Sequence, residues 1–238
     1  MPVYNHSFNL LKLTSPISKK GLKVFLVDDG SDELCKKVIE EVSKILPSVT
    51  IISLEKNYGK GAAVCIGFEE AVNAGFTHAI QMDSDGQHHP SYIDRFIELA
   101  DQNPYKLICG SRAYKSMPTA RARGRRISDF WVNINTLSIS IHDSMCGYRL
   151  YPLAAVKKLT SNSRIGQRMN FDSDIAVKLY WQGLGIVNLP VDVVYDPSLK
   201  SNFRMFWDNL HITLMHTSNF FGMLLRMPIL LARKFDHE

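Results

Sequence analysis

Asp83 and Asp85, in the stretch Asp83-Ser84-Asp85-Gly86-Gln87, are the residues whose types and spacing most clearly predict chemistry. They follow a mainly apolar run that is typical of a buried strand. Residues two apart in an extended chain point the same way, about 7 Å apart, so both carboxylates face one spot beyond the strand. Mg²⁺ favours one or two carboxylates together with substrate phosphates. The stretch therefore predicts either a divalent-cation site or an acidic turn, since Asp, Ser and Gly are also common turn residues.

Strands and helices alternate along the sequence in a way that would bring this turn to the edge of a sheet. Strands are predicted at 23–27, 49–54, 77–82, 106–109 and 186–194, and helices at 32–46, 59–74, 90–101, 126–137 and 169–181. The alternation predicts an α/β fold with a doubly wound, mainly parallel sheet flanked by helices. The length suits one such domain with a buried core.

Polar clusters follow the predicted strands: Asp28 with Asp29, residues 57–61, and the turn at 83–87. In doubly wound sheets, ligands bind outside the carboxyl ends of the strands. Three clusters at one edge are therefore a stronger indication of a binding site than any one of them alone.

A basic segment without acidic residues follows the strand predicted at 106–109. It contains Arg112, Arg121, Arg123, Arg125 and Arg126. A run of like charge is usually a solvated face or an interaction segment. Because it follows the candidate metal edge, we expect an anionic ligand. Nucleic acid is disfavoured, since the chain has no recognition motif and a net charge of only +5.

Residues 203–234 are rich in Phe, Trp, Leu and Met and carry scattered Arg and His. Their apolar runs are shorter than the ~20 residues that a membrane-spanning helix needs. The composition suits amphipathic helices in a membrane interface, or else helices that cover the core or an oligomer contact. We therefore expect one domain at 1–202 and a C-terminal amphipathic helical segment at 203–238.

The cysteines are widely spaced and include no CxxC pair, which favours free thiols and a reducing compartment. The N-terminus lacks the layout of a signal peptide. Both features favour the cytoplasm.

The motifs form an ordered set along nearly the whole chain. Pro2-Val3-Tyr4-Asn5 matches P-x-Y-N, Val27 to Asp32 matches VDDGSxD, Asn57 to Gly61 matches N-x-G-x-G, Asp83 to Gln87 matches DxDxQ, Gly110 to Arg112 matches GSR, Asp143 to Arg149 matches D-x-x-x-G-[FY]-R, and Phe171 to Asp174 matches an acidic acceptor-side motif. This set resembles the family 2 glycosyltransferases of the GT-A fold, closest to the dolichyl- and polyprenyl-phosphate glycosyl synthases. Asp174 stands where relatives often carry Glu. The family's first strand is expected to be clipped, unless Leu10 to Leu13 replaces it.

The resemblance implies a metal-dependent, inverting glycosyltransferase of the hexosyltransferase type. Its donor would be a UDP- or GDP-linked sugar, and its acceptor a lipid-linked molecule such as a polyprenyl phosphate, at the cytoplasmic face of a membrane. The implied roles are nucleotide-sugar binding by Pro2, Tyr4, Asn5, Asp28, Asp29, Lys60, Gly61, Asp83 and Ser84; Mg²⁺ or Mn²⁺ binding by Asp83, Asp85 and Gln87; and acceptor binding by Arg112, Arg121, Arg123, Arg125, Arg126, Asp143 and Arg149.

Asp85, through the metal, and Asp172 are the candidate catalytic residues. A hydroxyl acceptor would need Asp172 as a general base, whereas a lipid phosphate is already largely ionised at neutral pH. In that case the arginines would position the anion. The alternatives are a nucleotidyltransferase and a non-catalytic sugar-nucleotide-binding module. The sequence leaves the sugar, the nucleotide and the number of subunits open.

Overall fold

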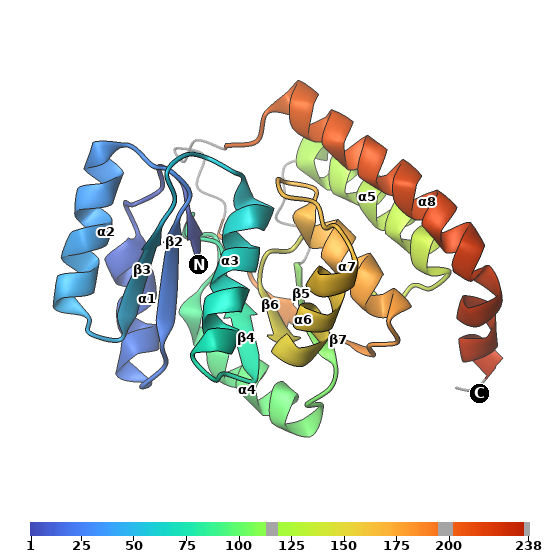
Figure 1. The fold of residues 1–238 in the computed structure, drawn as a ribbon, viewed down its shortest axis with the longest axis horizontal. Coiled ribbons are helices and arrows are strands. Elements are labelled where there is room, and N and C mark those ends of the chain that lie inside the picture. The colour runs from blue at the N-terminus through green and yellow to red at the C-terminus, as the bar shows by residue number, and fades with distance from the viewer. Residues whose placement is uncertain (113–118, 195–201, 236–238) are drawn as a thin grey trace.

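The computed structural model describes residues 1–112, 119–194 and 202–235. Strands and helices follow one another along the chain as β1(Pro2–Val3), α1(Leu10–Lys19), β2(Val24–Asp28), α2(Glu33–Ile45), β3(Val49–Ser53), α3(Lys60–Asn73), β4(His78–Gln81), η1(Pro90–Tyr92), α4(Ile93–Gln102), β5(Leu107–Arg112), α5(Thr119–Thr136), β6(Arg149–Pro152), α6(Leu153–Asn162), α7(Phe171–Trp181), β7(Ile186–Val191) and α8(Met205–Phe235). Figure 1 shows the strands between two groups of helices. The predicted α/β fold with flanking helices is therefore confirmed.

The N-terminal sheet is parallel, in the order β1-β2-β3. Figure 1 shows α1 and α2 on one side of it and α3 on the other. Neighbouring side chains of β2 serve the two faces: Leu26 joins the core beneath α1 and α2, and Phe25 packs with the cluster that includes Val64 of α3. This alternation follows from the period of two in an extended strand.

The second sheet has the order β4-β6-β5-β7, with β5 and β7 parallel. β6 was not predicted, and it runs antiparallel to both β4 and β5. Its four residues, Arg149–Pro152, are all buried, so they show neither an alternating pattern nor a long apolar run. This short strand is what separates β4 from β5.

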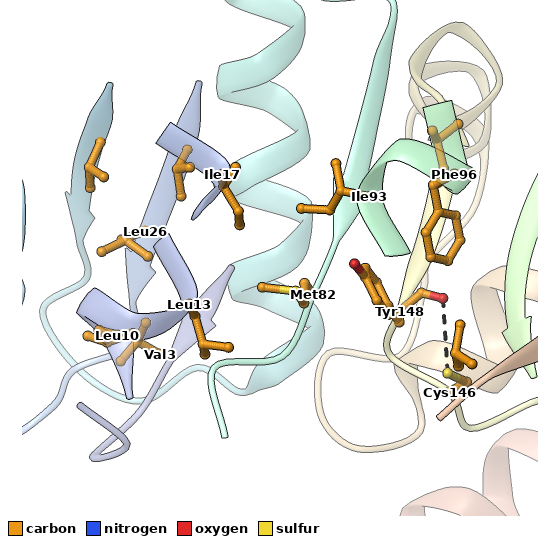
Figure 2. Close-up of a cluster of buried hydrophobic side chains, with 14 of the residues drawn as sticks. Val3, Leu10, Leu13, Ile17, Leu26, Met82, Ile93, Phe96, Cys146 and Tyr148 are labelled. Atoms are coloured by element: carbon orange, nitrogen blue, oxygen red, sulfur yellow. Dashed lines mark hydrogen bonds between the residues drawn. The ribbon is translucent and has the colours of Figure 1, made fainter. Parts of the chain in front are cut away.

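Residues Leu10 to Leu13 belong to helix α1, so the idea that they replace a strand is wrong. Leu10, Leu13 and Ile17 are buried at helical spacing on one face of α1. β1 has two residues, and its Val3 pairs with Asp28 of β2. In Figure 2 Leu10 and Leu13 lie beside Val3, and the cluster extends through Met82 toward Tyr148, so one core joins both sheets.

α5 and α8 lie side by side and cover α7 (Figure 1). Met215, Met223 and Leu230 are the buried apolar side chains of α8. Gly222 allows α8 to approach α7 closely, because a Cβ atom there would lie 2.7 Å from the Trp181 ring. Among the described residues, none of the helices is both long enough and apolar enough to cross a bilayer. The division of the chain at residue 202 stays a prediction.

Candidate active site

A cavity of ≈940 Å³ opens where the loops after β1, β2, β3 and β4 and the last residue of β5 face α5, the start of α7 and the first turns of α8. The predicted site residues that line it are Pro2, Tyr4, Asp29, Lys60, Asp83, Ser84, Asp85, Gln87, Arg112, Arg125 and Asp172. The structure thus brings most of the predicted set into one hollow at the expected sheet edge. The side chain of Arg121 lies outside the described residues. Arg123 and Arg126 are exposed on α5 and are not part of the cavity wall.

Asp29 holds the turn between β3 and α3 in place. Its carboxylate accepts hydrogen bonds from Asn57 Nδ2 at 2.9 Å, from the Tyr58 amide at 2.7 Å and from the Gly59 amide at 2.9 Å. Burial raises the pKa of Asp29, against the two amides and the charge of Arg168, which lower it. Both carboxylate oxygens are used to shape the cavity wall. A contact of Asp29 with a base or ribose stays a prediction.

Asp28 and Asn5 support this wall from behind and do not line the cavity. Asp28 Oδ1 accepts from the Ser31 amide at 2.9 Å, and its buried Oδ2 has no hydrogen-bond partner among the described residues. Asn5, in the left-handed region at φ 52°, accepts from the Asp32 amide at 2.8 Å. These bonds tie the loop after β1 to the start of α2. The predicted nucleotide contact of the two residues is therefore not a direct wall contact here.

Lys60, the first residue of α3, joins two carboxylates that are distant in sequence. Its Nζ lies 2.9 Å from Asp83 Oδ2 and 2.7 Å from Asp172 Oδ2. Burial would lower the pKa of Lys60, but Asp172 and Asp83 outweigh burial and raise it. Burial raises the pKa of Asp83 to about 6, although the Lys60 ammonium opposes that shift. Gly147 leaves room for this ion pair, since a Cβ there would lie 2.3 Å from Asp83 Oδ2 and 2.6 Å from Lys60 Nζ.

Both carboxylate oxygens of Asp172 are occupied. Oδ2 binds Lys60, and Oδ1 accepts from Gln81 Nε2 at 2.8 Å. Gln81 is held in turn by the Tyr151 hydroxyl, which donates to Gln81 Oε1 at 2.9 Å. Burial would raise the pKa of Asp172, but the charges of Lys60 and Arg149 outweigh it and lower the pKa. Asp172 is therefore a firmly ionised, well-anchored carboxylate at the cavity wall.

Asp143 and Arg149 are not part of the cavity wall, so their contact with an acceptor stays a prediction. Both are fully buried. Asp143 forms a bidentate pair with Arg112, whose Nε and Nη2 donate at 2.6 and 2.8 Å. Arg149 donates to the backbone oxygens of Asp172 and Ser144. The D-x-x-x-G-[FY]-R segment thus supports the site from the interior.

Gly61 packs closely against the loop between α6 and α7. A Cβ atom on Gly61 would lie 2.3 Å from the Gly166 carbonyl oxygen and 2.7 Å from Phe171 Cβ. Gly61 is not part of the cavity wall, and its contact with a nucleotide stays a prediction.

The turn after β4 offers oxygen atoms that fit a hard cation. Asp85 Oδ1 accepts from the Gln87 amide at 3.0 Å, and Gly86 closes the turn at φ 79°. Asp83 Oδ1 is buried and has no hydrogen-bond partner among the described residues. Within that part of the chain, no three His, Cys, Asp or Glu side chains converge on a metal position. The donor set therefore fits a cation that takes its remaining ligands from substrate phosphates and water.

Other residues line the cavity that sequence reasoning missed: His88, Trp131, Arg168, Arg204, Asp208 and His216. His88 follows the metal motif directly and packs against Tyr148, with ring centroids 5.1 Å apart and the rings tilted by 48°. Burial lowers the pKa of His88 to about 3, so the ring is neutral. Arg168 precedes the acidic motif at 171–174, and that position was the only sequence signal for it. Trp131 belongs to α5, Asp208 and His216 belong to α8, and Arg204 directly precedes α8. No sequence motif marked these positions.

A parallel-stranded α/β fold with an acidic turn at the cavity edge is the architecture of the GT-A glycosyltransferases. The structure resembles glucosyl-3-phosphoglycerate synthase from Mycobacterium tuberculosis, solved with Mn²⁺ and UDP-glucose. The TM-score is 0.62 and the identity 12%, over 90% of this chain and 76% of that one. At this identity, the likeness shows the fold.

Sequence comparison gives the family. Residues 1–160 match the glycosyl transferase family 2 model, which is more than half of the 238 residues. The chain is 26% identical to polyprenol monophosphomannose synthase of Mycolicibacterium smegmatis, over 80% of this chain and 74% of that protein. It is 24% identical to UDP-N-acetylglucosamine--dolichyl-phosphate N-acetylglucosaminyltransferase of Methanococcus voltae, over 82% of this chain and 84% of that protein. The chain belongs to glycosyl transferase family 2 and is a glycosyltransferase.

Proposed function

We propose that this enzyme transfers a sugar from a nucleoside-diphosphate sugar to a polyprenyl-phosphate lipid, with inversion and with the help of a divalent cation. The observation that carries the choice of acceptor is the state of Asp172. Its two oxygens are bound by Lys60 and Gln81, and its pKa lies below the usual value. The names of the two relatives, polyprenol monophosphomannose synthase and UDP-N-acetylglucosamine--dolichyl-phosphate N-acetylglucosaminyltransferase, support the same choice.

A hydroxyl acceptor and a phosphate acceptor make different demands on Asp172. General-base catalysis works best when the pKa of the base lies near the operating pH. A carboxylate with a lowered pKa, held by a lysine and an amide, is a weak base for a hydroxyl. A phosphate monoester has a second pKa of about 6 and attacks without losing a proton to the enzyme. The site therefore favours an ionised acceptor.

Arginines on the cavity wall suit such an acceptor. Arg125 lines the cavity from α5, and Arg112 lines it from the end of β5. Guanidinium groups bind phosphate with two parallel hydrogen bonds. We propose that Arg125 and Arg112 both contact the acceptor, because both line the cavity, and that Asp143 holds Arg112 in place through its bidentate pair. Arg123 and Arg126, which are exposed, are then better suited to an anionic membrane surface.

The donor would lie at the opposite wall, against Asp29, Lys60 and Asp83. Asp85, Asp83 and Gln87 would hold Mg²⁺ or Mn²⁺, which when bound neutralises charge on the departing diphosphate. Asp85 is the strongest candidate ligand, because among the described residues its carboxylate bonds only to its own turn. Asp83 also binds Lys60, so its carboxylate would be shared between that ammonium group and the metal ion.

The apolar surface beside the cavity suits a membrane. Ile127 and Phe130 of α5 and Phe206 and Trp207 of α8 are all more than half exposed. Ile127 and Trp131 also line the cavity, so apolar wall runs from the site to this surface. Amphipathic helices with apolar and basic side chains bind at the bilayer interface. We propose peripheral contact with the cytoplasmic face of a membrane, with the prenyl chain entering between α5 and α8.

Acceptor choice tests this function. The purified enzyme is incubated with Mn²⁺, a panel of radiolabelled UDP- and GDP-sugars, and either a polyprenyl phosphate or the matching polyprenol. We expect labelled lipid from the phosphate alone, together with free nucleoside diphosphate. Asp172→Asn should slow this reaction only mildly. Transfer to the polyprenol, abolished by Asp172→Asn, would instead assign a hydroxyl acceptor and a general base. Release of pyrophosphate would indicate nucleotidyl transfer.

A further inference from the structure

Arg168 lies in the loop between α6 and α7 and lines the cavity beside Lys60 and Asp29. It belongs to none of the motifs described above. We propose that Arg168 is a donor-binding residue whose guanidinium contacts the diphosphate of the sugar nucleotide. The inference rests on the proposed donor, and it adds a positively charged side chain that the motifs do not supply.

The loop that carries Arg168 is fixed at both sides. The Gly166 amide donates to Asp174 Oδ2 at 2.8 Å, which ties the loop to α7. The Ala62 amide donates to the Gln167 carbonyl at 3.0 Å, which ties it to the first turn of α3. Arg168 is therefore held in place before any ligand arrives, and binding costs less conformational entropy.

The glycines of the turn before α3 make this placement possible. A Cβ atom on Gly59 would lie 2.5 Å from the Gln167 carbonyl oxygen and 2.7 Å from Arg168 Cγ. Larger residues at Gly59 or Gly61 would push the loop away from the cavity. The N-x-G-x-G motif thus serves to bring Arg168 against the donor wall.

The charge of Arg168 is less committed than that of Lys60. Lys60 Nζ already binds the Asp83 and Asp172 carboxylates. Arg168 Nη1 donates to a neutral amide oxygen, Asn57 Oδ1, at 3.1 Å. That bond uses one of the five N–H donors of a guanidinium, so Arg168 can bind a phosphate oxygen at the same time.

The position of Arg168 agrees with a diphosphate. Asn57, which it contacts, also donates to Asp29 at the end of β2, where the nucleoside is expected. Arg168 Cγ approaches Gly59, which directly precedes Lys60 and the Lys60–Asp83 pair. The guanidinium thus lies between the nucleoside end and the metal end of the donor wall. Arginine is well suited to a phosphate group at such a place.

The test compares ligand binding by three variants. Arg168→Ala removes the group, and Arg168→Gln keeps an amide that can donate to Asn57 while removing the charge. Arg164→Ala is the matched control, because Arg164 is an exposed arginine of the same loop and is not part of this cavity wall. Affinities for UDP and GDP with Mn²⁺ are measured by calorimetry, and affinities for uridine and guanosine by ligand-observed NMR. Thermal melts check that each variant is folded.

We expect Arg168→Ala and Arg168→Gln to weaken binding of the preferred nucleoside diphosphate by about tenfold or more, as for loss of a charge-assisted hydrogen bond. Nucleoside affinity should be unchanged, and Arg164→Ala should bind as the wild type does. Equal diphosphate affinity in folded variants, or rescue by Arg168→Gln, would overturn the inference. An equal loss for the bare nucleoside would overturn it too. Failure of the wild type to bind UDP and GDP would instead overturn the proposed donor.

Discussion

Individual side chains in this site are held by partners far away in the sequence. Lys60 and Asp172 are separated by 112 positions, yet they form the central ion pair of the cavity. Gln81 and Arg149 hold the same aspartate from β4 and β6. Because these side chains hold one another in position, a small displacement of one of them should move the others as well.

Gly147→Ala tests this coupling. The added Cβ would lie 2.3 Å from Asp83 Oδ2 and 2.6 Å from Lys60 Nζ, so the ion pair must move. Misplacement of catalytic groups by about 1 Å can cost about 100-fold in rate, and we expect kcat/KM to fall by that order. Gly124→Ala on α5 is the control, because a Cβ there meets no atom within 4 Å. Unchanged turnover by a folded Gly147→Ala enzyme would contradict a catalytic role for the Lys60–Asp83 pair.

The buried pair of Arg112 and Asp143 makes a prediction about stability. Burial would raise the pKa of Asp143, but Arg112 outweighs it and lowers the pKa. A folded-state pKa below the unfolded value means stability that is present above about pH 4 and is lost as the pH falls further. Asp143→Asn leaves a buried guanidinium without its counter-charge and should cost about 3–5 kcal/mol.

Urea unfolding of Asp143→Asn at neutral and acidic pH measures both effects. The variant should lose less stability than the wild type on acidification. Glu98→Gln is the control, because its partner Arg95 lies on the surface and both side chains are more than half exposed. Such pairs contribute little. If Asp143→Asn were no less stable than Glu98→Gln, the buried pair would not matter to the fold.

At the scale of elements, α5 and α8 decide how the cavity meets its surroundings. They form one layer over α7 (Figure 1). Both helices carry exposed apolar side chains. A 31-residue helix with so many exposed apolar side chains is not explained by the core alone, since only part of one face is buried. Contact with a lipid surface would cover the remaining face.

Leu225→Ser on α8 tests that contact. Leu225 is 83% exposed, so the fold should keep its melting temperature while vesicle binding falls several-fold. Co-sedimentation with phosphatidylcholine vesicles, with and without phosphatidylglycerol, measures the loss. Leu34→Ser on α2 is the matched control, since Leu34 is 76% exposed and α2 lies at the far end of the molecule in Figure 1. Equal binding by both variants would rule out this face.

At the scale of the whole molecule, the cavity joins segments from both sheets with α5, α7 and α8. A ligand that binds there contacts every layer of the fold. Its binding energy should therefore stabilise the folded chain as one unit rather than a single loop.

A thermal-shift screen of UDP- and GDP-sugars tests this expectation. A ligand at 100 times its Kd stabilises the folded state by about 2.7 kcal/mol. For a chain of this length that corresponds to about 5–10 °C. The shift should need Mn²⁺ or Mg²⁺ and disappear with EDTA. A shift of equal size for both nucleotides without metal would contradict the metal-dependent donor site. In the part of the chain that the structure describes, the Asp85 carboxylate bonds only to its own turn, so Asp85→Ala should keep the fold and lose the metal-dependent part of the shift.

Local pattern was enough to locate most elements. The helix predicted at 32–46 is observed at Glu33–Ile45, and the one predicted at 59–74 is observed at Lys60–Asn73. Helical periodicity and short apolar runs depend on neighbours in sequence, so they can be read directly. β6 was not predicted because four buried residues carry no periodic pattern. α1 was not predicted because its apolar run was considered only as a possible strand.

The sequence by itself determined the family, the sheet edge where the cavity opens and the residues that could hold a cation. Those features depend on residue types at fixed short spacings. Only the tertiary structure decided which charges meet: Lys60 with Asp83 and Asp172, Arg112 with Asp143, and Arg168 with Asn57. The protonation state of a side chain depends on its burial, and its contacts depend on distances of a few ångström. Both arise only when segments far apart in the chain pack together.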